Sequence, residues 1–166
     1  MDDIAAAANV GRATLYRHFN SKVKVLEELS AWSALEGQHL AADLHRVAAE
    51  DAGVEALRAW LSRYAHFHRT YGGVIRAWYD GAVAQQLSED TVTQGLGAFH
   101  SAVADYLDHV QLPVGVDPPV AVAIFLAVMG RLTEMAVSQH PLDSDYETAT
   151  LMMTVLQRAL LGTTAR

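Results

Sequence analysis

The chain has 166 residues, of which 51% are hydrophobic, and its formal net charge is −7. This length suits one or two small domains with a sizeable core, and the absence of cysteine excludes disulfides, a thiol nucleophile and cysteine-ligated zinc. We find neither an uninterrupted apolar run of about 18 residues nor a basic, apolar leader. We therefore expect a cytoplasmic protein with no membrane partner.

The first segment, residues 1–26, has the pattern of a short helix, a turn, a second short helix and the start of a third. Gly11 suits the N-cap of a helix over Arg12–Phe19, in which Leu15 and Phe19 share one face toward a core. The side chains left for the other faces are Arg12, Ala13, Thr14, Tyr16, Arg17 and His18. A short helix that exposes such groups suits a groove lined with phosphates and base edges.

The third helix of this segment begins with Ser21 as N-cap and carries Lys22 in its first turn. A cation at this end opposes the helix dipole, so its expected partner is an external anion. The segment holds four basic and two acidic side chains, whereas the rest of the chain is strongly acidic. A locally basic segment on an acidic body is compatible with DNA binding.

Between Asp3 and Lys22 the chain reads Ile-Ala, small residues, a turn, Thr-Leu-Tyr, two further residues, Phe and then Ser-Lys. This pattern resembles the helix-turn-helix of the TetR/AcrR transcriptional regulators. The alternative is an ordinary amphipathic helix pair whose polar residues occur by chance. This alternative does not explain why the spacing, the turn and the caps all agree with the family pattern. The resemblance covers residues 1–26, and the remainder matches only in its helical layout.

The family that the segment resembles carries a further helix before this motif, packed across it, whereas this chain starts at the second helix. We therefore expect Ile4, Leu15 and Phe19 to lack that cover. A mis-assigned start, a truncation and a loss of DNA binding are all open as explanations. Operator DNA is the expected partner when the first helix is supplied.

Helical periodicity continues through the rest of the chain, and no strand candidate occurs. Gly72-Gly73 is expected to end one helix, and Asp117 with Pro118 is a start signal for another. Later helices are predicted over Ser21–Ala49, Val54–Tyr71, a shorter stretch to Tyr79, Thr91–Val110, Pro118–Gln139, and from Ser144 to Gly162. The fold class is all-α with eight helices. By resemblance, residues 1–26 are an incomplete helix-turn-helix and residues 27–166 are a TetR-like ligand-binding and dimerisation domain.

Aromatic side chains concentrate in the middle helices, which is typical of a ligand pocket. The candidate pocket residues are Trp60, Tyr64, Phe67, His68, Tyr71, Trp78, Phe99 and His100, with Tyr79 and Tyr106 in the same aromatic set. Plain core packing is the alternative for at least half of them. No lysine follows Lys24, and the later arginines mostly fall between apolar stripes. We therefore expect a small hydrophobic or aromatic effector, neutral or cationic.

The last two helices are apolar on more than one face and so need two partners. One partner can be the same pair from a second subunit, as the family resemblance also implies. The candidate interface residues are Ala121, Ile124, Phe125, Val128, Leu132, Met152, Val155, Leu156 and Ala159. The alternative is a well-buried monomeric core.

No enzyme, metal or cofactor is predicted. Asp105 and Asp108 lie among polar neighbours, and His66 and His68 point to different helix faces. The hypothesis is a ligand-responsive repressor that binds palindromic operator DNA as a homodimer and is released by its effector. The alternative is a dimeric small-molecule-binding helical module that does not bind DNA. By resemblance, Arg12 and Ala13 contact base edges, Thr14, Tyr16, His18 and Lys22 contact phosphates, and Arg17 contacts either.

Overall fold

Helices make up the regular structure in the computed structural model, which describes residues 1–50, 53–80, 89–138 and 144–161. The predicted all-α class is therefore confirmed. Within the described residues the α-helices number seven rather than eight, and a π-helical turn, η1 (Gln157–Leu161), extends the last of them. They are α1 (Asp2–Ala7), α2 (Arg12–His18), α3 (Lys22–Ala49), α4 (Gly53–Tyr79), α6 (Glu89–Asp108), α7 (Pro118–Ser138) and α8 (Asp145–Leu156).

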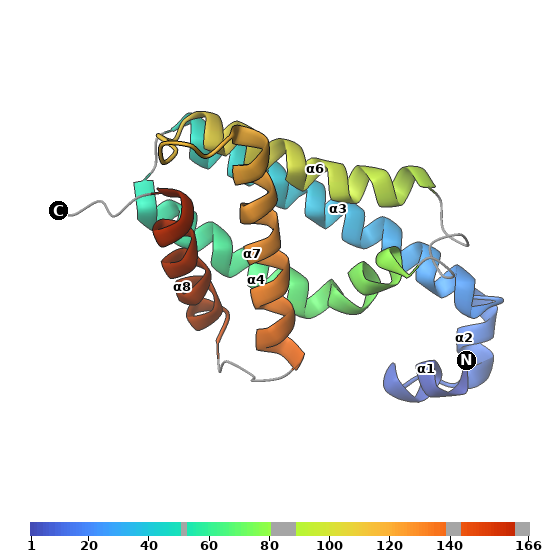
Figure 1. Ribbon diagram of the computed structural model, residues 1–166. Helices are drawn as coiled ribbons and strands as arrows, with labels where there is room; N and C mark the ends of the chain where they lie inside the picture. Colours follow the sequence, from blue (N-terminus) through green and yellow to red (C-terminus); the bar gives the residue numbers. More distant parts are fainter. Residues whose placement is uncertain (51–52, 81–88, 139–143, 162–166) are drawn as a thin grey trace.

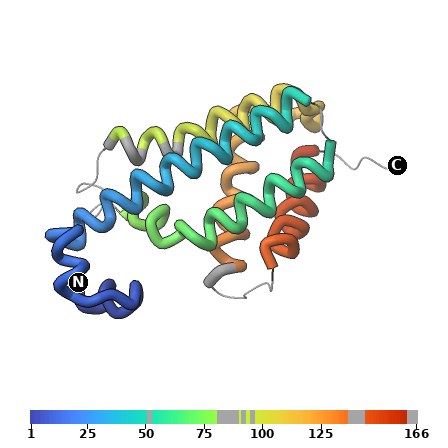
Figure 2. Tube along the Cα trace, turned by 180° about the vertical axis from the view of Figure 1, so that it is seen from behind, coloured from blue at the N-terminus to red at the C-terminus, as the bar shows by residue number. Residues whose placement is uncertain are grey.

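The two short helices α1 and α2 sit at the N-terminal end of α3, apart from the other helices (Figure 1). The long helix α3 continues from them into the body, where α6 lies along it and α4 packs against it. Helices α7 and α8 lie next to each other across α4, on the face opposite to the one seen in Figure 2. Among the described elements, α3 is the helix that runs from the N-terminal pair into the body.

The N-caps form where the sequence predicts them. Gly11 is extended at the start of α2, and the Ser21 and Ser144 side chains accept hydrogen bonds from Lys24 N and Glu147 N at 3.1 and 3.2 Å. Asn9 adopts a positive φ of 53° in the turn between α1 and α2, a conformation that asparagine tolerates better than most residues. Local chemistry thus determines these boundaries. The expected helix end at Gly162 lies outside the described residues.

Helix α4 corrects the sequence prediction, because it runs through Gly72-Gly73 to Tyr79 instead of ending there. Figure 1 shows the helix bending along this part of its length. Each interior glycine costs a helix about 1 kcal/mol relative to alanine, and burial offsets this cost. Val74 and Trp78 are buried against Ala34 of α3, and Trp78 Nε1 donates to Ser30 Oγ at 3.1 Å.

The core lies where α3, α4, α6, α7 and α8 meet, and Trp60 of α4 is fully buried in it. Its Nε1 donates to the carbonyl oxygen of Leu40 in α3 at 2.8 Å. A carbonyl oxygen within an α-helix normally accepts a hydrogen bond from its own helix. The bond from the Trp60 indole is an additional one, and it links α4 to α3. Trp60 therefore contributes both apolar volume and a specific α3–α4 contact.

Replacing Trp60 should destabilise the fold. Trp60→Ala should cost about 3–5 kcal/mol of unfolding free energy, because it empties a core site. Trp60→Phe should cost about 1–3 kcal/mol, since it removes the donor to Leu40 and part of the ring volume. Trp32→Ala is the matched control, because Trp32 is 60% exposed. Urea unfolding measures all three variants, and equal costs for the two alanine variants would contradict this role of Trp60.

Candidate functional site

The surface of α2 is divided as the sequence pattern predicts. Leu15 is buried, whereas Ile4 of α1 and Phe19 are half-buried. The remaining side chains of the helix and its neighbour Lys22 are all exposed, namely Arg12, Ala13, Thr14, Tyr16, Arg17, His18 and Lys22. The predicted nucleic-acid-facing set therefore forms a continuous accessible surface.

Arg12 already has two contacts on this surface. Its Nε lies 3.1 Å from Oδ1 of Asp2, and its guanidinium carbon lies 5.4 Å from the centre of the Tyr16 ring. The Arg12 and Asp2 side chains are both largely exposed, and surface ion pairs of this kind contribute little stability. The guanidinium can therefore exchange Asp2 for a stronger acceptor, such as the edge of a guanine.

The two lysines at the start of α3 differ in their surroundings. Lys24 Nζ lies 3.0 Å from Glu27 Oε2 and 3.7 Å from Glu28 Oε1, and the hydrogen bond that it donates to Glu27 raises the pKa of Lys24 above the ordinary value. Within the described part of the chain, no carboxylate pairs with Lys22. Lys22 is therefore the lysine of this pair that can take an external anion.

A second candidate site is a cavity of about 970 Å³ in the body of the protein. It lies between α4, α6 and α7, with Ser33 of α3 contributing to its lining. Cavities of a few hundred to about 1,000 Å³ accommodate molecules of the size of drugs and cofactors. The volume therefore suits one small-molecule ligand.

Most of the predicted pocket residues line this cavity. Tyr64, Phe67, His68, Trp78, Phe99 and His100 do so, and two others do not. Trp60 belongs to the core, and Tyr71 is half-buried beside the core and lines a different, more polar groove between α3, α4 and α8. Trp60, Tyr64, Phe67 and Tyr71 share one side of α4, so helical spacing alone does not tell which of them the neighbouring helices cover.

The aromatic wall of the cavity is built around Tyr64. The Tyr64 ring meets Phe99 of α6 edge-on at 5.5 Å between ring centres, and Phe67 lies 5.8 Å from Phe99. Gly37 of α3 allows this packing, because a Cβ at that position would lie 3.2 Å from Phe99 Cε2. Burial raises the pKa of Tyr64, so its hydroxyl stays protonated. The wall is therefore apolar, with a neutral hydroxyl as polar contact.

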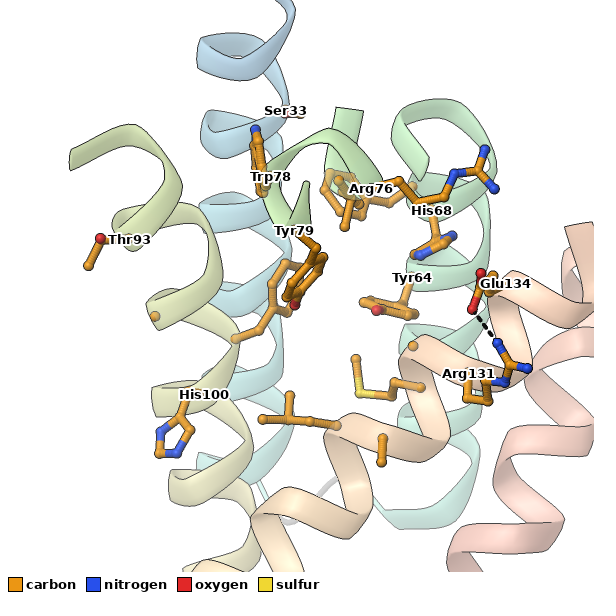
Figure 3. A pocket seen from close by; sticks show the side chains of 18 residues that line it. Ser33, Tyr64, His68, Arg76, Trp78, Tyr79, Thr93, His100, Arg131 and Glu134 are labelled. Carbon is orange, nitrogen blue, oxygen red and sulfur yellow. Dashed lines mark hydrogen bonds and ion pairs between the residues drawn. The ribbon is translucent and has the colours of Figure 1, made fainter. Parts of the chain in front are cut away.

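The part of the lining next to Tyr64 is polar, and the His68 ring lies 6.2 Å from the Tyr64 ring (Figure 3). This part contains His68 and Arg76 from α4 together with Arg131 and Glu134 from α7, and Arg131 Nη1 donates to Glu134 Oε2 at 2.7 Å. Two arginines on the lining correct the expectation of a pocket poor in cations. The sequence pattern places Tyr79 in the aromatic set of the pocket but does not predict Arg76, because it ends the helix at Gly72-Gly73. With α4 continuous, both follow His68 at helical spacing.

His68 is buried here, and its Nδ1 has no hydrogen-bond partner among the residues that the structure describes. Burial lowers its pKa below the ordinary value, Arg76 lowers it further, and Glu134 acts in the opposite direction. The ring is therefore neutral near pH 7. Gly72 makes room for it one turn along α4, since a Cβ there would lie 3.1 Å from His68 Nδ1.

Among the described residues, no group of three or more His, Cys, Asp or Glu side chains is arranged to hold a metal ion. The carboxylate at the cavity, Glu134, is already engaged by Arg131. The side chains that line the cavity therefore offer a ligand hydrogen bonds, aromatic faces and guanidinium groups rather than metal coordination.

The predicted interface residues divide into two groups. Ala121, Phe125, Met152 and Leu156 are fully buried in the chain's own core and cannot face a second chain, because α7 and α8 pack these side chains against α4 and each other. The remaining predicted residues reach the surface, with Ala159 exposed and Ile124, Val128, Leu132 and Val155 half-buried. Val120, Met135 and Leu151, which are 51%, 41% and 43% exposed, extend this apolar surface.

Helix α7 also contains a segment, Pro118–Ala136, that is long and apolar enough to cross a membrane by length and composition alone. One such helix is weak evidence, since core helices of soluble proteins meet the same criterion. Only 33% of this segment is buried within the chain. A large part of its apolar surface is therefore available for a partner.

Comparison with known proteins identifies the N-terminal part of the chain. Residues 1–29 match the model of the family described as bacterial regulatory proteins, tetR family. This match covers α1, α2 and the start of α3, and it supports a TetR-family transcription regulator with a helix-turn-helix DNA-binding segment. No curated protein and no solved structure matches the chain.

The neutral state of His68 predicts a pH dependence of stability. Because its pKa is lowered in the folded protein, the unfolded chain binds more protons as the pH falls below about 6.5, and stability is lost in that direction. His68→Gln should weaken this loss, whereas His39→Gln, at an exposed position on α3, should leave it unchanged. Thermal unfolding between pH 8 and pH 5 (about one to two units on either side of the ordinary histidine pKa) measures the effect. Parallel profiles for wild type and His68→Gln would contradict it.

Proposed function

We propose that this protein is a ligand-responsive transcriptional repressor of the TetR type, which binds palindromic operator DNA as a homodimer. The observation that carries the proposal is the surface of α2, where the polar and basic side chains are exposed and Leu15 is buried, within the segment that matches the family. Such a helix can lie in the major groove with its side chains divided between bases and phosphates. We place the protein in the cytoplasm, where its operator would be.

In this proposal α2 is the recognition helix. Arg12 and Ala13, at its N-terminal end, contact base edges, the guanidinium taking guanine O6 and N7 and the methyl group meeting thymine. Thr14, Tyr16, His18 and Lys22 contact phosphates, and Arg17 contacts either. Two copies of α2 in a dimer would read half-sites about one helical turn or somewhat more apart.

The two lysines at the start of α3 allow a matched test of DNA binding. Lys22→Ala should weaken binding to all sequences and lower the slope of log affinity against log salt concentration by about 1. Lys24→Ala should have a smaller effect, because Glu27 and Glu28 already neutralise Lys24. Arg12→Ala should instead cost about 1–3 kcal/mol at one base position.

Fluorescence anisotropy with an operator selected from random DNA measures these effects over a range of salt concentrations. An unchanged salt slope for Lys22→Ala would remove this residue from the phosphate contacts. A protein that selects no sequence from the random pool would contradict the repressor function and favour a ligand-binding module without DNA binding.

The homodimer is proposed to form through the exposed apolar surface of α7, α8 and η1. Its support is the continuous set of accessible apolar side chains, which comprises Val120, Ile124, Val128, Leu132, Met135, Leu151, Val155 and Ala159. A second copy of the same surface would cover it around a two-fold axis and form a four-helix interface. In this arrangement protein, rather than lipid, covers the apolar segment of α7.

Ala159 offers a test that leaves the monomer core intact. Ala159→Asp should convert the dimer to a monomer, because it places an unpaired carboxylate in an apolar interface, while the exposed position spares the fold. Ala42→Asp, at an exposed position on α3, is the control and should remain dimeric. Sedimentation velocity measures the mass of each protein. A dimeric Ala159→Asp variant would move the interface away from η1.

The effector is proposed to bind in the cavity between α4, α6 and α7 and to be a small molecule with an apolar or aromatic body. The support is the aromatic wall around Tyr64 and Phe99, together with a volume that fits one ligand. A ligand in this position contacts α4, α6, α7 and Ser33 of α3, the helix that leads to the DNA-binding segment. It can release the operator only if it binds the DNA-competent and released states with different affinities.

A further inference from the structure

The charges on the cavity lining define the ligand more narrowly. Arg76 and Arg131 are the guanidinium groups on this lining, and Glu134 is the acidic group among its described residues. Arg131 and Glu134 are paired at 2.7 Å, whereas no carboxylate among the described residues pairs with Arg76. At neutral pH the described part of the lining therefore presents one net positive charge, located at Arg76.

We propose that the ligand of this cavity is an amphipathic monoanion, a carboxylic acid with an aromatic or alkyl body, whose carboxylate binds Arg76. This inference rests on the proposed function, in which the cavity is the effector site. The carboxylate lies at the polar part of the lining beside His68, and the body extends toward Tyr64, Phe99 and Met129. A carboxylate matches the forked donors of a guanidinium and can accept two parallel hydrogen bonds from it.

The position of Arg76 explains why one charge is suited to this place. The arginine belongs to the last turns of α4 and is exposed, so that water still reaches the ion pair. The carboxylate therefore does not pay the full cost of burial in an apolar interior. The aromatic and aliphatic side chains further inside, Ile75, Phe67, Leu126 and Met129 among them, accept only apolar groups.

Ligands of other charge fit the same lining less well. A cation would face Arg76 and would find its only lining carboxylate, among the described residues, already bound to Arg131. A dianion would leave one charge without a partner next to Glu134. A neutral ligand would fill the apolar part but leave the Arg76 guanidinium without a counter-ion. The cationic effector expected from the sequence is therefore disfavoured.

Three probes of one shape separate these possibilities: biphenyl-4-carboxylate, the neutral biphenyl-4-carboxamide and the cation biphenyl-4-ylmethylammonium. Isothermal titration calorimetry at neutral pH gives the dissociation constant of each with the full chain. We expect the carboxylate to bind at least about tenfold more tightly than the amide, which is what one charged hydrogen bond contributes. The cation should bind more weakly than either.

Two variants locate the charge and the cavity. Arg76→Gln should remove the preference for the carboxylate and leave the affinity for the amide within about twofold, since a glutamine keeps the polar contact but loses the charge. Arg63→Gln is the matched control on the same helix, because Arg63 lies outside this cavity and pairs with Asp43 at 3.1 Å. Gly130→Phe should abolish the binding of all probes, because Gly130 lines the cavity and a Cβ there meets no atom within 4 Å.

The outcomes distinguish the ligand class from the site. Equal affinities for carboxylate and amide, or tighter binding of the cation, would overturn the monoanion while the cavity remained a binding site. A carboxylate preference that survives Arg76→Gln would also overturn it. Binding that survives Gly130→Phe, or no binding of any probe, would overturn both the monoanion and the proposed effector cavity.

Discussion

The close approach of three helices at Gly37 is the constraint on which the body of this protein depends. A Cβ at this position of α3 would lie 3.2 Å from Phe99 Cε2 of α6, which is tighter than an ordinary contact, and 3.5 Å from Phe67 Cζ of α4. These two rings hold Tyr64 in place, and Tyr64 separates the core around Trp60 from the open cavity. The lack of a side chain at Gly37 therefore allows the ring packing that lies between the core and the cavity.

Helix α4 lies on both sides of that boundary. Its first half buries Leu57, Trp60 and Leu61 completely, and its second half presents His68 and Arg76 to the cavity. The two halves are continuous across Gly72-Gly73, and the absence of a side chain at Gly72 leaves room for the His68 ring. A single helix therefore contributes both to the core and to the cavity lining.

The sequence predicts best those features that depend on neighbouring residues. The caps at Gly11, Ser21 and Ser144, the division of α2 into a buried and an exposed face, and the all-α class follow from local spacing and capping chemistry. Whether a side chain on the apolar face of a helix is fully buried depends on packing against helices that are distant in the sequence. The apolar pattern therefore predicts Trp60 and Tyr71 in the pocket and Phe125 and Met152 in an interface. In the structure the core covers Trp60, Phe125 and Met152, and Tyr71 lies outside the cavity.

The uninterrupted length of α3 has a mechanical consequence. Ser33 lines the cavity and Gly37 contacts its aromatic wall, whereas Lys22 begins the same helix next to α2. At about 1.5 Å per residue, the helix places roughly 22 Å of stiff rod between Gly37 and Lys22. A tilt of about 5° around the Gly37 contact would displace the far end of this rod by about 2 Å. Such a tilt would transmit a change at the aromatic wall along α3 to the basic helix α2.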